Sequence, residues 1–322
     1  MKRTPQEQLT HFLSDMYSVE QQALAQLVSA PEIAGDLGLA ADFREHHDET
    51  ERQAELVRER LEACGGSPSA VKDAIMKIGG KGFLLFAQVQ PETPGRLIDH
   101  AYAYEAMEWA GYEMLIRFAK AADDAETVAT AETIRRQERA MMERLEKRFD
   151  AAEQASHVDV SPEELDQHLT KHLAEVHAFE SQGVQLLEKS QKIAGNSSLE
   201  EVYHKQLLRI REHMRLVEER LEALGSDVSE LRDGVLAVAG LNWGWFFQMQ
   251  SDTPAKLAAF VYAVLHLQIG GYELLKRTAQ RLADPQTQSL CETVLADKRQ
   301  MAEMLVASFD SAIQATLEAV HA

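Results

Sequence analysis

The sequence predicts an all-α protein made of two tandem four-helix bundles, and three observations support this prediction. Ala, Leu, Glu, Gln and Arg are abundant among the 322 residues, and runs of β-branched residues are rare, which favours helix over sheet. Helix-capping residues, Pro and Gly cluster at a few breaks between long helical stretches. The chain also repeats itself at one fixed offset of 160 positions.

The repeat extends without a gap across nearly the whole of each half. The segments at 33–36, 60–63 and 111–113 return at 193–196, 220–223 and 271–273. Self-similarity at a fixed offset indicates two copies of one structural unit. We therefore expect two domains, residues 1–153 and residues 161–322, with the linker between them at about 152–161.

Helix signals place four long helices in each copy. In the first copy, a capping box followed by Pro opens helix 1 at Thr4, and Gly35 ends it. Helix 2 spans about 38–64. Thr93-Pro94 opens helix 3, and a polar turn at Asp123-Asp124 joins it to helix 4. Equivalent signals recur in the second copy.

Helix 2 and helix 3 are separated by a long connection of nearly thirty residues in each copy. Two helical hairpins joined by one long crossover have the connectivity of a ferritin-like four-helix bundle. An up-down bundle with short loops would not need that segment. The expected fold is therefore all-α, with two tandem ferritin-like four-helix bundles that each contain a long helix 2 to helix 3 crossover.

Charge and cysteine content exclude several classes of function. The formal net charge of -19 would repel phosphate backbones and anionic lipids, so we expect neither nucleic acid nor membrane as a partner. No apolar leader or membrane span is evident, which predicts a cytoplasmic protein. Cys64 and Cys291 are the only cysteines and occupy unmatched positions, so neither a disulfide framework nor a zinc ribbon is expected.

The first copy carries a carboxylate on or beside the apolar seam of every helix. Core positions of a bundle helix recur at alternating spacings of three and four residues. A single glutamate near such a seam is usually solvated, but here several coincide near the helix midpoints. The candidates are Glu20 on helix 1, Glu49 beside the seam of helix 2 and one turn from His46, Glu105 and Glu108 on helix 3, and Glu138 on helix 4.

Five carboxylates inside one bundle would repel one another and lose their hydration, and both effects oppose ionisation. Two arrangements would resolve this. Several acids stay protonated as a coupled cluster, or cations are coordinated among them. We favour the second, with two iron ions, or manganese in their place, sharing the carboxylates as in di-iron carboxylate bundles.

The second copy lacks most of these acids. The equivalent positions hold Glu180, Arg209, Leu265, Gln268 and Lys298. Four of the five carboxylates are replaced, two of them by cations, so a metal site there would have almost no ligands. We expect a bundle without a metal site, in which Arg209 and Lys298 pair with Glu180.

These residues resemble those of the YciF/YciE-like ferritin-like family, formerly a domain of unknown function. The matching motifs are His46-x-x-Glu49-Thr50-x-x-Gln53, Glu105-x-x-Glu108-x-x-x-Tyr112 and Gln137-Glu138-Arg139-Ala140. The resemblance covers both copies, and it implies four-helix bundles with a dinuclear metal site that pair as dimers. The fused repeat looks like such a dimer within one chain, and the chain is also a candidate homo-oligomer.

The resemblance implies that the metal ligands or their immediate neighbours are Glu20, His46, Glu49, Glu105, Glu108 and Glu138. The wider di-iron pattern carries Glu-x-x-His twice, but here Arg52 and Met141 occupy the two histidine positions. Nitrogen ligation therefore rests on His46, with His47 as the alternative.

The leading functional hypothesis is a ferritin-like metalloprotein of stress response, with redox activity of the oxidase or peroxidase type as a conditional second step. Two alternatives belong to other classes. One is a non-enzymatic metal-binding protein, and the other is a structural helical module with a protonated acid cluster. The sequence singles out no catalytic residue.

Overall fold

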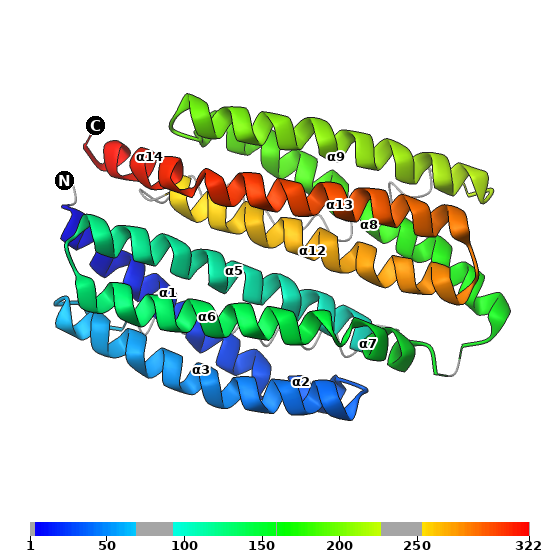
Figure 1. Ribbon diagram of the computed structural model, residues 1–322, viewed down its shortest axis with the longest axis horizontal. Coiled ribbons are helices and arrows are strands. Elements are labelled where there is room, and N and C mark those ends of the chain that lie inside the picture. Colours follow the sequence, from blue (N-terminus) through cyan, green and yellow to red (C-terminus); the bar gives the residue numbers. More distant parts are fainter. Residues whose placement is uncertain (1–3, 69–92, 159, 227–252, 322) are drawn as a thin grey trace. The chain divides into compact units, whose positions relative to one another are not determined.

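The computed structural model describes residues 4–68, 93–158, 160–226 and 253–321 (Figure 1). Every regular element among these residues is a helix, which confirms the all-α prediction for the described part of the chain. The chain divides into two compact units, the first extending to Ser156 and the second running from His157 to Ala319.

Among the described residues, the first unit is a ring of four long helices. Its helices are α1 (Pro5–Leu27), α2 (Ala30–Ile33), α3 (Leu37–Ala63), α5 (Thr93–Ala121), α6 (Ala125–Glu146) and α7 (Phe149–Ser156). Helix α1 packs on α3 and α5, and α6 packs on the same two helices, so the ring is closed (Figure 1). Apolar residues at spacings of three and four fill its centre, such as Leu13 and Met16 on α1.

Helices α3 and α5 run in the same direction. The start of α3 lies by the start of α5, because a Cβ placed on Gly35 would lie 2.6 Å from Cγ of Pro94. The far ends also meet, because Arg60 on α3 pairs with Asp124, just beyond α5, at 3.0 Å. The end of α3 and the start of α5 therefore lie at opposite ends of the unit. Residues 69–92, most of the predicted crossover, lie outside the described residues.

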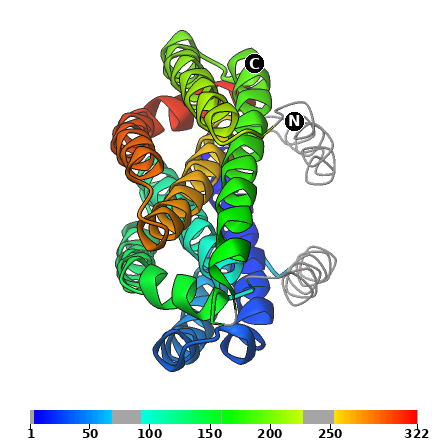
Figure 2. The ribbon, with the colours of Figure 1, turned by 90° about the vertical axis from the view of Figure 1, so that its right-hand side faces the viewer.

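The second unit repeats this arrangement. Its helices are α8 (Pro162–Ile193), α9 (Ser197–Ala223), α12 (Thr253–Arg281), α13 (Pro285–Ala307) and α14 (Phe309–His321). Helix α8 packs on α9 and α12, and α13 packs on the same two helices. Figure 2 looks more nearly along the helices, and the long helices of each unit can be followed in it by colour. Arg220 pairs with Asp284 at 2.6 Å, as Arg60 does with Asp124.

The two predicted capping boxes, at Thr4 and Ser161, are present. Thr4 accepts a hydrogen bond from the backbone N–H of Glu7, whose carboxylate accepts one from the backbone N–H of Thr4. Ser161 and Glu164 form the same capping box. Gly35 takes a φ of 68°, a left-handed conformation that glycine adopts without steric cost, in the turn before α3.

Helix 1 differs between the two units, which the repeat alone did not predict. In the first unit α1 ends at Leu27, and the short helix α2 follows. Pro31 explains the break, because its ring has no N–H to donate and clashes with the carbonyl four residues earlier. The equivalent residue in the second unit is Gln191, and α8 continues there to Ile193.

The expected linker at 152–161 overlaps a helix, so it is shorter than predicted. Residues 152–156 belong to α7, which packs on α5. Phe149 and Ala152 are buried, and the hydroxyl of Ser156 accepts a hydrogen bond from the backbone N–H of Gly95 at 2.9 Å. The chain leaves this helix only at His157.

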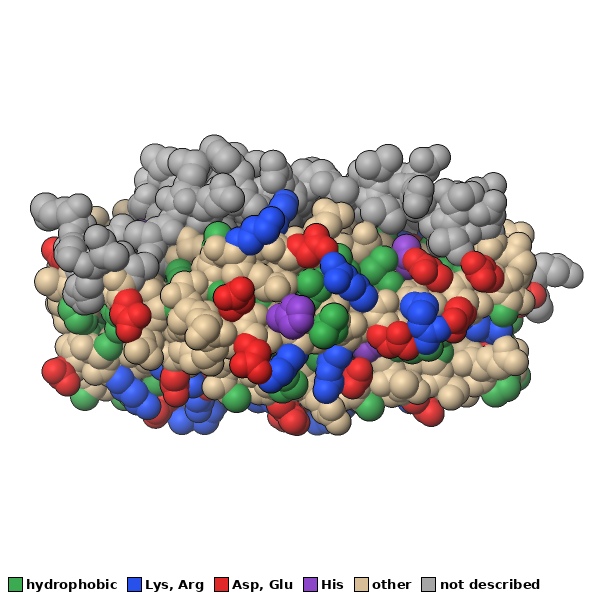
Figure 3. All heavy atoms as spheres, turned by 90° about the horizontal axis from the view of Figure 1, so that it is seen from above, with side chains coloured by type: hydrophobic (Ala, Val, Ile, Leu, Met, Phe, Trp, Pro, Cys, Tyr) green, Lys and Arg blue, Asp and Glu red, His purple; other side chains and the backbone are tan. Residues whose placement is uncertain are grey.

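Helix α12 is, among the described residues, the one helix long and apolar enough for a membrane span. Its most apolar stretch has a mean hydropathy of 1.3, and 72% of that stretch is buried within the structure. Core helices of soluble proteins have the same properties. On the face drawn in Figure 3, acidic and basic side chains lie intermingled among the described residues.

Candidate metal centre

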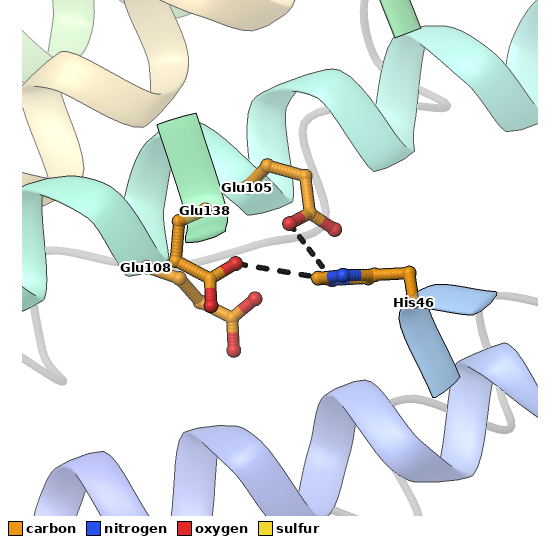
Figure 4. A group of neighbouring side chains, drawn as sticks. All are labelled: His46, Glu105, Glu108 and Glu138. Atoms are coloured by element: carbon orange, nitrogen blue, oxygen red, sulfur yellow. Dashed lines mark ion pairs between the residues drawn. The ribbon is translucent and has the colours of Figure 1, made fainter. Parts of the chain in front are cut away.

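Four side chains from three helices converge inside the first unit. They are His46 on α3, Glu105 and Glu108 on α5, and Glu138 on α6 (Figure 4). One potential ligand atom from each lies within 4.8 Å of the others. None of the four residues is more than 4% exposed. We call these four residues the buried cluster.

Helix periodicity holds these acids inside. Glu105 and Glu108 are three residues apart on α5 and so share one face of the helix. On α6, Glu138 lies between Ile134 and Met141, at spacings of four and three, and both of these neighbours are fully buried. Rotating Glu138 outward would expose that apolar stripe. The packing of the helix therefore sets the position of the carboxylate.

The imidazole of His46 stands between three carboxylates. Its Nε2 lies 3.0 Å from Oε2 of Glu105 and 3.8 Å from Oε2 of Glu138 (Figure 4). Its Nδ1 lies 3.2 Å from Oε2 of Glu49. Burial by itself would lower the pKa of His46, but the charge and close contact of Glu105 and the hydrogen bond with Glu49 raise it well above its usual value.

Glu20 on α1 lies beside the buried cluster. It is fully buried, and its Oε1 accepts a hydrogen bond from the hydroxyl of Tyr112 on α5. Burial raises the pKa of Glu20 to about 8, although the hydrogen bond from Tyr112 and the charge of His46 oppose the shift. The neighbouring Tyr104 donates its own hydroxyl proton to the carbonyl oxygen of Val19 at 3.0 Å.

Several carboxylate oxygens here accept no hydrogen bond from the described residues. They are Oε2 of Glu20, Oε1 of Glu108 and Oε2 of Glu138, and Oε2 of Glu105 has only the close but poorly aligned His46 ring. Buried oxygens are nearly always satisfied, so such a group indicates a missing proton or cation. Burial, reinforced by the neighbouring acids, raises the pKa of Glu108 and of Glu138 well above the usual range.

Glu49 lies outside the buried cluster, on the opposite side of the His46 ring. Its side chain is 18% exposed, and Nη2 of Arg144 donates to its Oε2 at 2.6 Å. The hydrogen bond with His46 and the contact with Arg144 lower the pKa of Glu49 to about 2. His47 also lies apart from the buried cluster, in a solvent-facing group with Asp48 and Glu51.

Comparison with known families places both units in one family. The sequence profile of the family described as "Domain of unknown function (DUF892)" matches residues 4–156 and 164–318. The chain belongs to this family. The two matches follow the two structural units closely, so each unit is one DUF892 domain. Comparison with curated proteins and with solved structures gives no match.

The structure adds two contacts around the cluster of the first DUF892 domain that sequence reasoning missed. Gln53 donates through Nε2 to Oε1 of Glu138 at 2.5 Å, and Arg144 binds Glu49. Gln53 belongs to the helix 2 motif and lies seven residues after His46, so its position on the same helix face was visible in the sequence. Arg144 gave no such signal, because its partner depends on how α3 and α6 align.

The second DUF892 domain has an ion pair where the first has its cluster. Nζ of Lys298 lies 2.8 Å from Oε1 of Glu180 and donates to Oε1 of Gln268 at 2.9 Å. The predicted pairing of Lys298 with Glu180 is therefore present. The predicted pairing of Arg209 with Glu180 is wrong, because Arg209 binds Asp297 at 2.8 Å. Like Glu49 in the first domain, Arg209 lies at the partly exposed edge of its helix.

Proposed function

We propose that the first DUF892 domain is a ferritin-like bundle that binds a dinuclear iron or manganese centre. The observation that carries the proposal is the convergence of buried carboxylate oxygens that accept no hydrogen bond from the described residues. Coordination of cations would satisfy those oxygens and remove the repulsion between the acids. The parallel course of α3 and α5 supports the ferritin-like topology.

Charge balance supports two ions. Glu20, Glu105, Glu108 and Glu138 together would carry four negative charges when ionised, and all four are buried. Two divalent cations balance that charge if the imidazole of His46 is neutral. A single ion would leave two uncompensated charges in the interior, at a cost of several kcal/mol each.

The donor set fits iron or manganese. Carboxylate oxygens suit hard cations, and one imidazole nitrogen extends the preference to transition metals. Glu105, Glu108, Glu138 and Nε2 of His46 would hold the ions, with Glu20 completing the set from α1. Glu49 contacts the other nitrogen of His46, so we assign it to orienting that ring.

Bound iron or manganese would supply one-electron redox chemistry toward oxygen or peroxide, and a carboxylate-rich set stabilises the higher oxidation state. The chain itself contributes a closed interior. The ligand-bearing side chains are buried, and Tyr112 fixes the orientation of Glu20 by donating its hydroxyl proton. We therefore propose oxidase-type or peroxidase-type activity, associated with stress response, as the second step of the hypothesis.

A structural module with a protonated acid cluster is the second candidate. The raised pKa values of Glu20, Glu108 and Glu138 favour it, because neutral carboxyl groups need no counter-ion. A protonated Glu138 could share a hydrogen bond with Glu105. Oε2 of Glu20 and Oε1 of Glu108 accept no hydrogen bond from the described residues, and this argues against a fully protonated cluster.

Elemental analysis of the full chain separates these candidates. After anaerobic loading with Fe²⁺ and desalting, the wild-type chain should retain about two ions, and Glu108→Gln should retain far fewer. Glu143→Gln removes the same charge from an exposed position on α6 and should retain as many ions as the wild type. Equal and negligible metal in all three proteins would establish the structural module instead.

Stopped-flow absorbance then separates redox activity from passive binding. The Fe²⁺-loaded chain is mixed with oxygen or with hydrogen peroxide, and near-ultraviolet absorbance reports oxidation. We expect oxidation faster than that of free Fe²⁺ in the same buffer, and no acceleration with Glu108→Gln. If the loaded chain protects Fe²⁺ from both oxidants, it is a metal-binding protein without this activity.

A further inference from the structure

We propose that Arg144 is a positioning residue for the metal centre, which holds Glu49 in place as the acceptor of the Nδ1 proton of His46. The inference rests on the proposed function of the first DUF892 domain. It assigns the Arg144–Glu49 pair the task of presenting Nε2 of His46 to the buried cluster. Arg144 lies in no predicted ligand set, and Glu45 and Glu49, the carboxylates that it binds among the described residues, lie outside the buried cluster.

One carboxylate oxygen carries the connection. Oε2 of Glu49 accepts from Nη2 of Arg144 at 2.6 Å, and the same atom lies 3.2 Å from Nδ1 of His46. The opposite ring nitrogen, Nε2, faces Glu105 at 3.0 Å. Guanidinium, carboxylate and imidazole therefore form a continuous chain of contacts from the edge of the bundle to its buried acids.

With a cation bound among the buried acids, the chemistry of these groups fixes the tautomer. An ionised carboxylate can only accept hydrogen bonds, so Nδ1 of His46 must carry a proton when it faces Glu49. A neutral imidazole protonated at Nδ1 keeps its lone pair on Nε2, the nitrogen that faces the cluster. Such carboxylate partners orient ligating histidines, and their loss commonly weakens metal binding 10-fold to 100-fold.

Arg144 is needed because Glu49 stands near solvent. The side chain of Glu49 is 18% exposed and that of Arg144 is 22% exposed, so water can compete for this carboxylate. Arg144 also binds Glu45, one helical turn before Glu49, at 3.2 Å. With Glu45 and Glu49 on one face of α3, the guanidinium is held from two sides. Without it, the carboxylate of Glu49 is free to turn away from His46.

A neighbouring ion pair separates this role from simple bracing. Arg148 binds Asp42 at 2.6 Å and also joins the end of α6 to α3, but that pair does not contact His46. In the second domain both pairs are absent, since Met304 and Ser308 replace the two arginines. The loss of both pairs in the second domain therefore does not by itself assign Arg144 a role. The assignment rests on the contact between Glu49 and His46.

The test uses the full chain, stripped of metal and titrated with Co²⁺. Visible absorbance gives the affinity, and the hyperfine-shifted, exchangeable Nδ1 proton of a bound histidine gives an NMR signal that bracing alone would not move. Arg144→Gln should weaken Co²⁺ binding about 10-fold to 100-fold and broaden or remove that signal by faster exchange. Arg144→Lys keeps the charge and should restore part of both, and Arg148→Gln should match the wild type.

The outcomes distinguish this inference from the function beneath it. If the wild type binds Co²⁺, Glu108→Gln does not, and Arg144→Gln behaves as wild type in both readouts, Arg144 has no positioning role and the metal centre stands. If neither wild type nor Glu108→Gln binds Co²⁺, the metal centre and this inference fall together. Should Arg144→Gln fail to fold by circular dichroism, Glu49→Gln tests the same contact and must show the same losses.

Discussion

Nζ of Lys298 lies 2.8 Å from Oε1 of Glu180 in the second DUF892 domain, and both side chains are fully buried. The equivalent residues of the first domain are Glu138 and Glu20, two carboxylates. An ammonium group on a covalent tether therefore occupies the place where the first domain needs a proton or a bound cation. One fold thus balances the same interior acid in two different ways.

Removing the ammonium group should destabilise the second domain strongly. Lys298→Met leaves the carboxylate of Glu180 buried without its cation, and breaking a buried pair in this way costs about 3–5 kcal/mol. Glu180→Leu should have a similar effect, because Lys298 then lacks its counter-ion. Urea unfolding of the full chain, with hydrogen exchange in α8 and α13 as the local readout, measures both.

The double variant Lys298→Met with Glu180→Leu is the matched control. Replacing a whole buried pair by apolar residues is often neutral, so it should recover most of the stability lost in either single variant. Part of the loss should remain, because Oε1 of Gln268 loses its donor. Single variants as stable as the wild type would mean that Lys298 and Glu180 reach water in solution.

Much of the fold could be predicted from the sequence because its signals are local. Capping boxes at Thr4 and Ser161 and the glycine at the turn before α3 depend on neighbouring residues only, and the repeat transfers each signal to the other copy. The break after Leu27 was also local, because Pro31 causes it, but the repeat suggested a continuous helix. A local sequence difference between the copies therefore overrides the repeat.

The site could be predicted only in part, for a geometric reason. Glu20, Glu105, Glu108 and Glu138 occupy seam positions, whose inward direction follows from helix periodicity. Glu49 lies one position off the seam. At such a position the rotation of α3 relative to α6 determines whether the side chain faces the buried cluster or the partly exposed edge of the bundle. The same ambiguity explains the wrong partner predicted for Arg209, the equivalent of Glu49 in the second domain.

The N-cap of α6 should contribute substantially to the stability of the first domain. Asp124 accepts a hydrogen bond from the backbone N–H of Thr127 at 3.0 Å and binds Nη2 of Arg60 through both oxygens. Asp124→Ala removes a cap worth about 1 kcal/mol and hydrogen bonds to a charged group worth about 1.5–3 kcal/mol. Hydrogen exchange in the first turn of α6 should therefore accelerate markedly.

The repeat supplies the comparison for that experiment. Asp284→Ala should produce a loss of the same order confined to α13, because Asp284 caps that helix and binds Nη2 of Arg220 through Oδ2. Glu126→Gln, at an exposed neighbour that also contacts Arg60, should change little. An effect of Asp124→Ala no larger than that of Glu126→Gln would contradict the assigned role.

The metal-free first domain should lose stability as pH rises from about 4.5 to about 8. The pKa of Glu20 is raised from 4.5 to about 8 by burial, so across this interval the folded state keeps a proton that the unfolded state releases. Its contribution is fully present below pH 4.5, and the stability falls by about 1.4 kcal/mol for each pH unit per such group. Urea unfolding in the presence of a chelator measures the slope.

Glu20→Gln isolates that contribution, because an amide does not titrate. The slope between pH 5 and pH 8 should become shallower by about one proton. The remaining slope reflects Glu108, Glu138 and, above about pH 6.5, His46, whose pKa values are also raised. Glu143→Gln, on the exposed face of α6, should leave the slope unchanged. A metal-free wild type with no slope in this window would mean that these acids are ionised and hydrated.

Bound metal should stabilise the first domain, and it should leave the second domain unchanged. Ligation by Glu105, Glu108, Glu138 and His46 ties α3, α5 and α6 together, and a ligand at 100 times its Kd stabilises the folded state by about 2.7 kcal/mol. Hydrogen exchange in those three helices should slow on addition of Mn²⁺, while α9, α12 and α13, where Lys298 occupies the equivalent site, should exchange as before. The protection should disappear with chelator and with Glu108→Gln. Slowing of equal size in both domains would instead indicate non-specific binding of the cation to the acidic surface.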